Sequence, residues 1–243
     1  MVKKILVILF LITSSGNLYS QKKNICNKWD ILDSMITNLQ IEEDEAFDLM
    51  KEYNTEVRSY FRQHKGVNVS RNDWVFPLKN YTSVHYRDYG NDYKVAGYDY
   101  FQGSNTKGHP AHDLMIPDKN KDLLDDSTLK PVDVVSMSSG VVVATDTTWK
   151  AGSLLRGGKY VKIFDVTNNG LFYYSHLSEV IVRPGDIVVS GDKIGEVGRT
   201  GRKANLKEGK THLHISFLKF NEDGYPFPED IIKDLRNSEI REN

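Results

Sequence analysis

The stretch Thr211-His212-Leu213-His214-Ile215-Ser216-Phe217 is the segment from which the fold can be inferred. Its β-branched and aromatic residues surround two histidines, a composition typical of a β-strand. Side chains alternate between the two faces of a strand, so His212 and His214 point to one side. Leu213 and the other odd-numbered apolar residues then point into a core. Two imidazoles on one face suit either two metal ligands or one ligand beside one catalytic base.

Short apolar strands surround this stretch. The sequence predicts strands at residues 132–137 and 140–144, which we expect to pair with each other, and at 160–166, 171–176, 186–189 and 193–197. The turn Thr167-Asn168-Asn169-Gly170 contains Asn-Gly, a strong signal for a β-hairpin. No long helical pattern falls between residues 130 and 225. These features predict a mainly β fold with an antiparallel β-sheet domain.

The segment before the β region, residues 28–65, predicts two helices. Trp29, Leu32 and Ile36 recur at helical spacing, and a second apolar stripe follows the acidic run at residues 42–45. Acidic residues suit a helix N-terminus, where the helix dipole favours negative charge. We therefore expect a helical hairpin that packs on the β-domain; the alternative is a plug over an active site.

The N-terminus has the pattern of a targeting segment. Lys3 and Lys4 precede an apolar run at residues 5–12, and a plausible cleavage site follows Ser20. The run is shorter than the roughly 20 residues that span a bilayer. We predict a signal peptide at residues 1–20 and an exported protein, periplasmic or extracellular, with no membrane span after cleavage. An uncleaved anchor is the alternative.

The overall composition narrows the possible partners and metals. The chain has 243 residues, with 32 basic and 33 acidic side chains and a net charge of −1. This balance gives no reason to expect nucleic acid or an anionic membrane as a partner. Cys26 is the single cysteine, so a metal site must use His, Asp or Glu. The sequence says little about the oligomeric state, which stays open, and a monomer is favoured.

A second cluster of possible ligands is Gly108-His109-Pro110-Ala111-His112-Asp113. His109 and Asp113 are four residues apart across a Pro-Ala bend that can bring an imidazole and a carboxylate together. A catalytic zinc commonly takes three protein ligands and leaves a fourth position for water. Together with His214 these two residues would suit Zn²⁺. His112 is a competing ligand that spacing alone does not exclude, and a loop aspartate capped by a histidine is the other interpretation.

Three motifs in order resemble a known family. His109-x-x-x-Asp113, Phe172-Tyr173-Tyr174-Ser175-His176 and His212-x-His214 are similar to motifs of the lysostaphin-like (LytM-type) zinc endopeptidases, which cut peptidoglycan peptides. The glycine-rich segments at residues 156–161 and 182–201 also resemble that family, with Lys159 where an asparagine is usual. The resemblance covers roughly residues 74–220 and implies the family's duplicated hybrid motif fold.

The resemblance also implies the role of each site residue. It places His109, Asp113 and His214 on the zinc, and it makes His212 and His176 the catalytic pair. His212 would take a proton from water and deliver it to the leaving amine, and His176 would hydrogen-bond the water or the developing oxyanion. Which of the two histidines is the dominant base stays open.

The function implied is an exported zinc metalloendopeptidase that hydrolyses peptide bonds in peptidoglycan stem peptides or cross-links. Two alternatives stand beside it. One is a non-catalytic family member that binds the wall or regulates another hydrolase, and the other is a zinc peptidase that acts on proteins. The sequence does not say which peptide bond is cleaved.

Two departures from the family pattern concern residues near the first ligand. Ala111 and His112 occupy positions where the family often has a glycine and an aliphatic residue, so His112 is a candidate hydrogen-bond partner of the site. Residues 118–126 form an acidic insertion, in which Asp118, Asn120 and Asp122 resemble the first positions of a calcium loop. A bound Ca²⁺ and a solvated acidic loop are the two interpretations of this insertion.

These observations predict a division of the chain into five parts. The parts are a signal peptide at residues 1–20, a helical region at 21–66, a linker at 67–73, a zinc endopeptidase domain at 74–235 and a C-terminal tail at 236–243. Whether the helical region inhibits the enzyme is open at this stage.

Overall fold

The structure of the protein is a computed structural model that describes residues 24–242. The predicted signal peptide at residues 1–20 lies outside these described residues. Within them, no helix combines the length and the apolar character that crossing a membrane requires.

The described chain forms a mainly β, antiparallel fold, as predicted, and its strands make two sheets. The small sheet has the order β1-β4-β10-β8, formed by β1 (Leu78–Lys79), β4 (Asp133–Val135), β10 (Lys193–Glu196) and β8 (Glu179–Val180). The large sheet has the order β2-β3-β11-β7-β6-β5-β9, with β12 also paired to β11. Its strands are β2 (His85–Tyr86), β3 (His112–Met115), β11 (His212–Phe220), β7 (Gly170–Leu177), β6 (Lys159–Asp165), β5 (Gly140–Asp146), β9 (Ile187–Val188) and β12 (Pro226–Glu229).

Both faces of the large sheet are covered by apolar groups. Leu213 and its alternate neighbours on β11 are fully buried against the small sheet, in a core that also contains Trp74 and Phe76. Leu218 and Phe220 point to the opposite face and lie in a second core. The alternation predicted for the His212 strand is therefore confirmed by the burial of its side chains.

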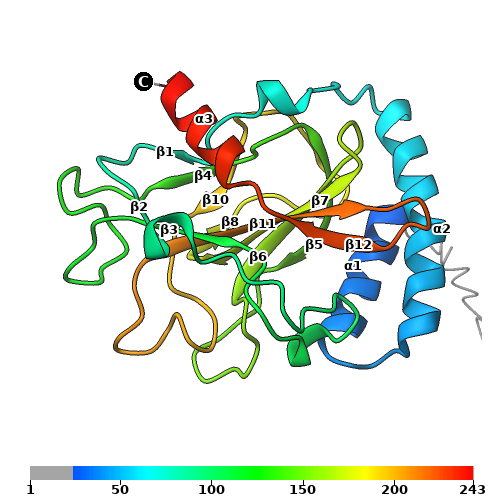
Figure 1. Cartoon of the computed structure of the whole chain (residues 1–243), viewed down its shortest axis with the longest axis horizontal. Coiled ribbons are helices and arrows are strands. Elements are labelled where there is room, and N and C mark those ends of the chain that lie inside the picture. Colours follow the sequence, from blue (N-terminus) through cyan, green and yellow to red (C-terminus); the bar gives the residue numbers. More distant parts are fainter. Residues whose placement is uncertain (1–23, 243) are drawn as a thin grey trace, which may run out of the picture.

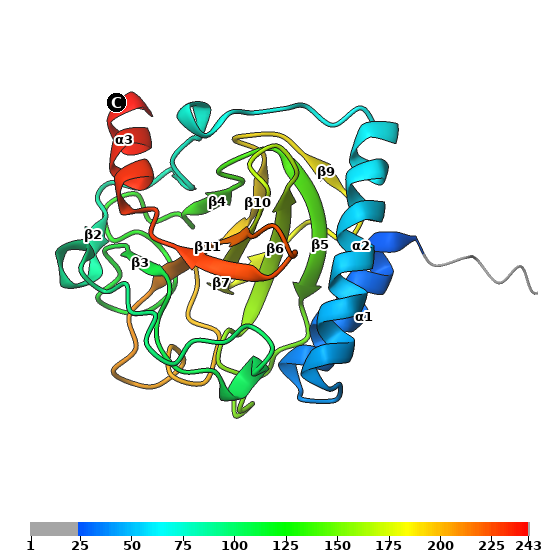
Figure 2. The same cartoon turned by 45° about the vertical axis from the view of Figure 1, so that its right-hand side comes forward.

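Two helices form the predicted hairpin and cover the second core. They are α1 (Ile25–Thr37) and α2 (Glu43–Gln63), which lie side by side on one flank of the β-domain (Figures 1 and 2). Trp29 is fully buried, and its ring centroid lies 5.7 Å from that of Phe164 and 6.4 Å from that of Phe220. The hairpin shares a continuous apolar core with the large sheet, so its burial contributes to the stability of the β-domain.

The hairpin also makes polar contacts with the sheet. Asp30 accepts a hydrogen bond from the backbone N–H of Thr145 at 2.9 Å, and the Tyr60 hydroxyl donates to the Gly185 carbonyl at 3.0 Å. Among the described hydrogen bonds and ring contacts of the two helices, none involves His109, His176, His212 or His214. The hairpin therefore packs beside the histidine cluster, on the same face of β11 but at the other end of the strand.

One predicted strand pairing is confirmed and another is wrong. β6 and β7 form an antiparallel hairpin across the Asn-Gly turn, where Asn169 adopts a left-handed conformation with φ 54°. β4 and β5 do not pair with each other, because the chain passes from the small sheet to the large sheet between them. Both strands are largely buried on both faces. Their apolar pattern therefore indicated strands but carried no information about which neighbour each would take.

Two segments expected to lie outside the β-domain are attached to it. Within the predicted linker, the short 3₁₀ helix η1 (Arg71–Asp73) places Arg71 in ion pairs with Asp234, at 2.7 Å, and with Glu229. Helix α3 (Ile232–Glu242) runs through the position where we expected the domain to end. Leu235 is fully buried in the core between the sheets, which explains why the helix continues the domain.

Candidate metal centre

Three neighbouring strands bring the predicted site residues together. In the register of the large sheet, His214 on β11 lies opposite Asp113 on β3 and opposite Ser175 on β7. His109 precedes β3 and is tied back by a pair of backbone hydrogen bonds with Lys94, of 2.6 and 2.8 Å. Residues separated by about a hundred positions thus meet at one end of the sheet.

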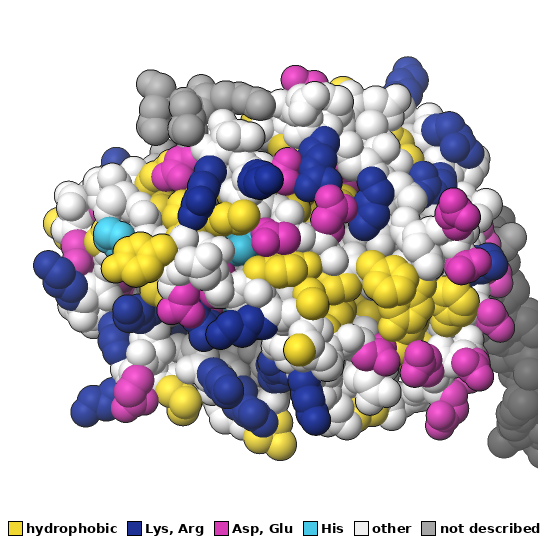
Figure 3. Space-filling view, viewed as in Figure 1, with side chains coloured by type: hydrophobic (Ala, Val, Ile, Leu, Met, Phe, Trp, Pro, Cys, Tyr) yellow, Lys and Arg dark blue, Asp and Glu magenta, His cyan; other side chains and the backbone are white. Residues whose placement is uncertain are grey.

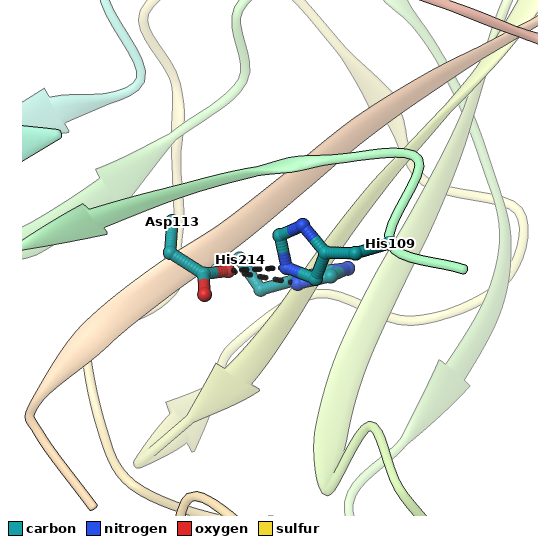
Figure 4. A group of neighbouring side chains, drawn as sticks. All are labelled: His109, Asp113 and His214. Atoms are coloured by element: carbon teal, nitrogen blue, oxygen red, sulfur yellow. Dashed lines mark hydrogen bonds and ion pairs between the residues drawn. The ribbon is translucent and has the colours of Figure 1, made fainter. Parts of the chain in front are cut away.

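Three side chains offer ligand atoms to a common point. The candidate ligand atoms of His109, Asp113 and His214 all lie within 4.8 Å of one another. Asp113 Oδ1 is 3.1 Å from His109 Nε2 and 3.0 Å from His214 Nδ1. Figure 4 marks these two contacts with dashed lines. Two imidazole nitrogens and one carboxylate oxygen are a donor set that fits zinc, and three protein ligands leave a position open for water. Among the described residues, this is the one group of His, Cys, Asp and Glu that could hold a metal.

Asp92 positions two of these three ligands. Its backbone carbonyl accepts a hydrogen bond from His109 Nδ1–H at 2.9 Å. Because this nitrogen is the donor, Nε2 of His109 is the atom that remains for a metal. The Asp92 carboxylate accepts the backbone N–H of Asp113, also at 2.9 Å, and the Asp92 side chain is almost completely buried. Partners of this kind fix the orientation of a ligand, so Asp92 is part of the centre.

Arg87 holds the other oxygen of the aspartate ligand. Its Nη1 lies 2.9 Å from Asp113 Oδ2, and the Asp113 side chain is only 5% exposed. Since this guanidinium occupies Oδ2, Oδ1 is the oxygen that faces both histidines. The arrangement favours a ligand that binds a metal through one oxygen.

His112 lies on the opposite face of β3 and does not join the ligand group. Its Nδ1 lies 2.9 Å from Asp92 Oδ1 and its Nε2 lies 2.9 Å from Asp230 Oδ1. Asp230 also accepts the backbone N–H of Ile232 at the start of α3. Both ring nitrogens are therefore engaged by carboxylates, and His112 connects Asp92 to the C-terminal helix instead of competing as a ligand.

His176 and His212 lie beside the ligand group, and the hydrogen bonds recorded for their rings among the described residues are made through Nδ1. Nδ1 of His176 donates to the Thr200 carbonyl at 2.7 Å, and Nδ1 of His212 donates to the Lys210 carbonyl at 2.7 Å. A carbonyl can only accept, so both rings carry a proton on Nδ1 and have an Nε2 lone pair when neutral. The two ring centroids are 4.7 Å apart, and His212 Nε2 is 3.9 Å from Asp113 Oδ1. Both histidines can accept or donate a proton next to the ligands.

His176 reaches this position through an irregularity in β7. The register between β6 and β7 shifts near Lys159 and Tyr160, and His176 has a left-handed backbone with φ 65°. Such bulges commonly redirect a side chain next to an active site, at some cost in backbone strain. Gly201 has φ 105°, and a Cβ there would lie 2.3 Å from the Arg156 carbonyl and 2.8 Å from the His176 ring. A glycine is therefore required against this histidine.

The segment that contains three of the site histidines matches a known protein family. Residues 125–226 match the family model described as Peptidase family M23. This part of the chain is similar to an M23 peptidase domain. The matched segment contains His176, His212 and His214, whereas His109 and Asp113 precede it. The predicted resemblance to lysostaphin-like enzymes is thereby confirmed.

Solved structures similar to the chain include peptidases of the same kind. One is the "putative glycyl-glycine endopeptidase lytM" of Ruminococcus gnavus, with 21% identity over 87% of this chain and 81% of that chain, and a TM-score of 0.48. Another is lysostaphin from Staphylococcus simulans, with 21% identity over 61% of this chain and 51% of that chain, and a TM-score of 0.37. A zinc-containing peptidase from Vibrio cholerae has 18% identity over 70% of this chain and 40% of that chain, and a TM-score of 0.39. No curated protein matches the chain significantly.

The electrostatics of the candidate metal centre favour an ionised Asp113 and neutral rings for His214 and His176. Burial alone would raise the pKa of Asp113, but hydrogen bonds from His109 and His214 outweigh it and hold the pKa well below its usual range. Burial lowers the pKa of His214, and burial together with the nearby His212 lowers the pKa of His176 strongly. For His109, burial lowers the pKa, but the hydrogen bond and the charge of Asp113 together with the contacts to Asp92 outweigh burial and raise it. A metal ligand must be neutral imidazole or carboxylate, and the lowered pKa values of His214 and Asp113 favour these states.

The acidic insertion at residues 118–126 uses its oxygens in hydrogen bonds within the loop and to Thr211. Asp118 accepts the backbone N–H groups of Asp122 and Leu123 at 3.1 and 3.0 Å, and it also accepts the hydroxyl of Thr211. Asn120 is bonded to Asp122 at 2.8 Å. The predicted calcium site therefore finds no support, because these side chains stabilise the loop backbone.

Sequence reasoning missed two residues of this centre. Asp92 and Arg87 precede the first ligand by 17 and 22 positions in an irregular segment. A buried aspartate has no periodic pattern that would set it apart from surface carboxylates. The sharpest signal was the unusual His112, because a buried imidazole requires partners of this kind.

Proposed function

We propose that the protein is an exported, zinc-dependent endopeptidase that hydrolyses peptide bonds in peptidoglycan stem peptides or cross-links. The observation that carries the proposal is the convergence of His109, Asp113 and His214 beside two histidines whose Nδ1 atoms are hydrogen-bonded to backbone carbonyls. Three ligands plus a base are what metal-assisted peptide hydrolysis requires.

The proposed zinc ligands are His109 through Nε2, Asp113 through Oδ1 and His214 through Nδ1. His109 Nε2 and Asp113 Oδ1 are left available by the hydrogen bonds to the Asp92 carbonyl and to Arg87, and His214 Nδ1 is the ring nitrogen that faces Asp113 Oδ1. When bound, zinc supplies a Lewis acid for the scissile carbonyl and lowers the pKa of its water from about 15.7 towards about 7.

His212 is the proposed general base. Its Nε2 is 3.9 Å from Asp113 Oδ1, which puts it within reach of a water molecule held next to the ligands. The Lys210 carbonyl fixes the Nδ1–H tautomer, so Nε2 can accept the water's proton and later pass it to the leaving amine. The ring is 11% exposed, which limits competition from bulk water.

His176 is the proposed partner on the other side of the reacting carbonyl. Its ring centroid is 5.5 Å from that of His214 and 4.7 Å from that of His212. A ring in this position can donate a hydrogen bond to the developing oxyanion once it has gained a proton, or it can orient the water through its lone pair. The Thr200 carbonyl and Gly201 keep the ring in place.

The proposed peptidoglycan substrate and the proposed export are supported by different observations. The M23 family assignment and the ordered motifs favour cell-wall peptides as the substrate. Export is supported by the residues that precede the described part of the chain, where two lysines, an apolar run and a cleavage site follow one another.

The test is digestion of purified sacculi by the mature chain loaded with zinc, followed by mass analysis of the released muropeptides. We expect His214→Ala to lose metal and activity together. His212→Ala should keep the metal and lose about 10²–10⁴ in rate, the scale of a missing general base. His64→Ala is the matched control, because His64 is an exposed histidine at the end of α2.

The outcomes separate the alternatives. Full activity of His214→Ala would remove the zinc assignment. Purified protein that holds zinc but releases no muropeptide, while it cleaves an unfolded protein, would replace the peptidoglycan substrate with a protein substrate. Protein that binds sacculi without zinc and without cleavage would be a non-catalytic member of the family.

A further inference from the structure

An open pocket lies next to the candidate metal centre and takes no part in the chemistry proposed above. Its volume is ≈ 600 Å³, within the range of about 300–1,000 Å³ that is usual for small-molecule sites. The lining that matters for its chemistry consists of the basic Arg87, Lys210 and Arg236 and the rings of His85, Tyr86 and Tyr89. On the face drawn in Figure 3, basic side chains, apolar side chains and a histidine come together over the region of β2 and α3.

The strand register connects this pocket to the catalytic strand. His85 on β2 lies opposite Met115 on β3, and Met115 lies opposite His212 on β11. Lys210 is two residues before His212, and its carbonyl is the acceptor that fixes the His212 tautomer. Across the sheet, one residue, Met115, therefore separates His85 in the pocket wall from the proposed base His212.

Arg87 belongs to both the pocket and the metal centre. Its Nη1 pairs with Asp113 Oδ2 at 2.9 Å, and 46% of its side chain is exposed. The guanidinium has five N–H donors in a planar fork. The Nη1 group of Arg87 pairs with Asp113, a proposed zinc ligand. The remaining N–H groups of the guanidinium are available to a molecule in the pocket.

The charge of the pocket is unbalanced. Three basic side chains line it, and the acidic group in its lining is Asp88. Among the ion pairs between described residues, none involves Lys210 or Arg236. The nearby Glu239 accepts the Tyr86 hydroxyl at 2.8 Å. Two cations without a carboxylate partner, close to a third, attract an anion.

The pocket wall is held in an unfavourable backbone conformation. Within η2 (Arg87–Gly90), Asp88 and Tyr89 both have left-handed backbones, with φ 47° and 57°. Tyr89 nevertheless exposes 89% of its surface, so its conformation does not serve to bury the ring. Arg236 on α3 donates to the Tyr89 carbonyl at 2.8 Å and lies with its Cζ 5.9 Å from the Tyr86 ring centroid. Strain of this kind persists where the surrounding structure enforces it, and it is concentrated at ligand sites.

We propose that this pocket binds a free carboxylate of the peptide substrate and so selects peptides that carry one near the scissile bond. The proposal rests on the proposed function, because it concerns the substrate of that same centre. Arg236 and Lys210 supply the charge, Tyr86 and Tyr89 flank the peptide, and Arg87 sets the distance to the metal centre. A carboxylate fits better than a neutral sugar, because a sugar would leave these cations unpaired next to it.

The test uses two synthetic copies of a cross-linked stem-peptide dimer. They are identical except that the terminal carboxylates are free in one copy and carboxamides in the other. For the wild-type protein we expect KM to be about tenfold lower for the acid than for the amide, with kcat similar, the scale of one partly exposed charge-assisted contact. In Arg236→Gln and in Lys210→Gln the KM ratio should approach one. Added salt should weaken the preference in the wild-type protein.

The matched control is Lys233→Gln, which removes an exposed charge from the same helix as Arg236 but outside the pocket. Equal KM values for acid and amide in the wild-type protein, or the same change in the control, would overturn the proposal. If neither dimer is cleaved, the proposed function fails, and calorimetric binding of the two dimers decides the pocket by itself. Tighter binding of the acid that is lost in Arg236→Gln supports it, and equal or absent binding of both dimers overturns it.

Discussion

The buried carboxylate of Asp33 should be one of the largest polar contributors to the stability of this fold. It belongs to α1, is fully buried, and accepts hydrogen bonds from Tyr100 at 3.0 Å and from Tyr160 at 2.8 Å. It also forms an ion pair with Lys162 on β6, whose side chain is 11% exposed. Replacing Asp33 with leucine would leave a buried ammonium group and two buried hydroxyls without their acceptor.

The size of the loss follows from these contacts. Removing one member of a buried ion pair commonly costs about 3–5 kcal/mol. The ammonium group of Lys162 keeps some stabilisation, because it lies 5.0, 5.5 and 5.3 Å from the ring centroids of Tyr100, Tyr160 and Tyr173. We therefore expect Asp33→Leu to lose about 3 kcal/mol, near the lower end of that range. For a chain of this length the corresponding fall in Tm is about 6–12 °C.

Urea denaturation of the metal-free protein, followed by circular dichroism, measures this loss without a contribution from bound metal. The second arm is the double variant Asp33→Leu with Lys162→Met, which removes both charges. It should lose only about 1–2 kcal/mol, since the tyrosine hydroxyls alone remain unpaired. A loss below about 1 kcal/mol for Asp33→Leu, or a double variant no more stable than the single one, would refute this account of how α1 is attached.

Two further predictions concern single charged side chains. Asp125 is fully buried and accepts four hydrogen bonds from Thr82, Ser127 and Thr128. Burial alone would raise its pKa, but these hydrogen bonds outweigh burial and lower it. Asp125→Asn should therefore lower the free energy of unfolding by about 1–3 kcal/mol at neutral pH. A lowered folded pKa stabilises the protein above the unfolded value of about 3.9, and this effect is lost as pH falls through the folded value. The difference between variant and wild type in urea titrations should therefore begin to shrink below pH of about 3.9 and disappear below the folded pKa. Arg87→Gln should weaken zinc binding about 10–100-fold in a chelator competition, because Asp113 Oδ2 loses its charged partner; unchanged affinity would contradict the role given to that contact.

The patterns that could be read from the sequence are local ones. The faces of β11 followed from alternation, the β6–β7 hairpin from its Asn-Gly turn, and the two N-terminal helices from three- and four-residue spacing. The roles of His109, Asp113 and His214 came from the resemblance, and the structure brings these side chains together.

What could not be read depends on contacts distant in sequence. β4 and β5 are apolar on both faces, so nothing in their pattern showed that they belong to different sheets. Asp92 lies in an irregular segment, and its importance arises only when His109, His112 and Asp113 surround it. The C-terminal helix was missed for a similar reason, because it is stabilised by the buried Leu235 and by Arg71, which lies 163 positions from its partner Asp234.

The contact between Asp113 and His214 closes a loop of 101 residues. Closing so long a loop lowers the entropy of the chain before the contacts between its ends can stabilise it. Folds dominated by such non-local contacts therefore form slowly. The ligand atoms consequently meet only after β3 has paired with β11 across the whole length of the domain. No short fragment of the chain contains the site, so we expect the proposed metal centre to form only in the folded domain and not in isolated fragments.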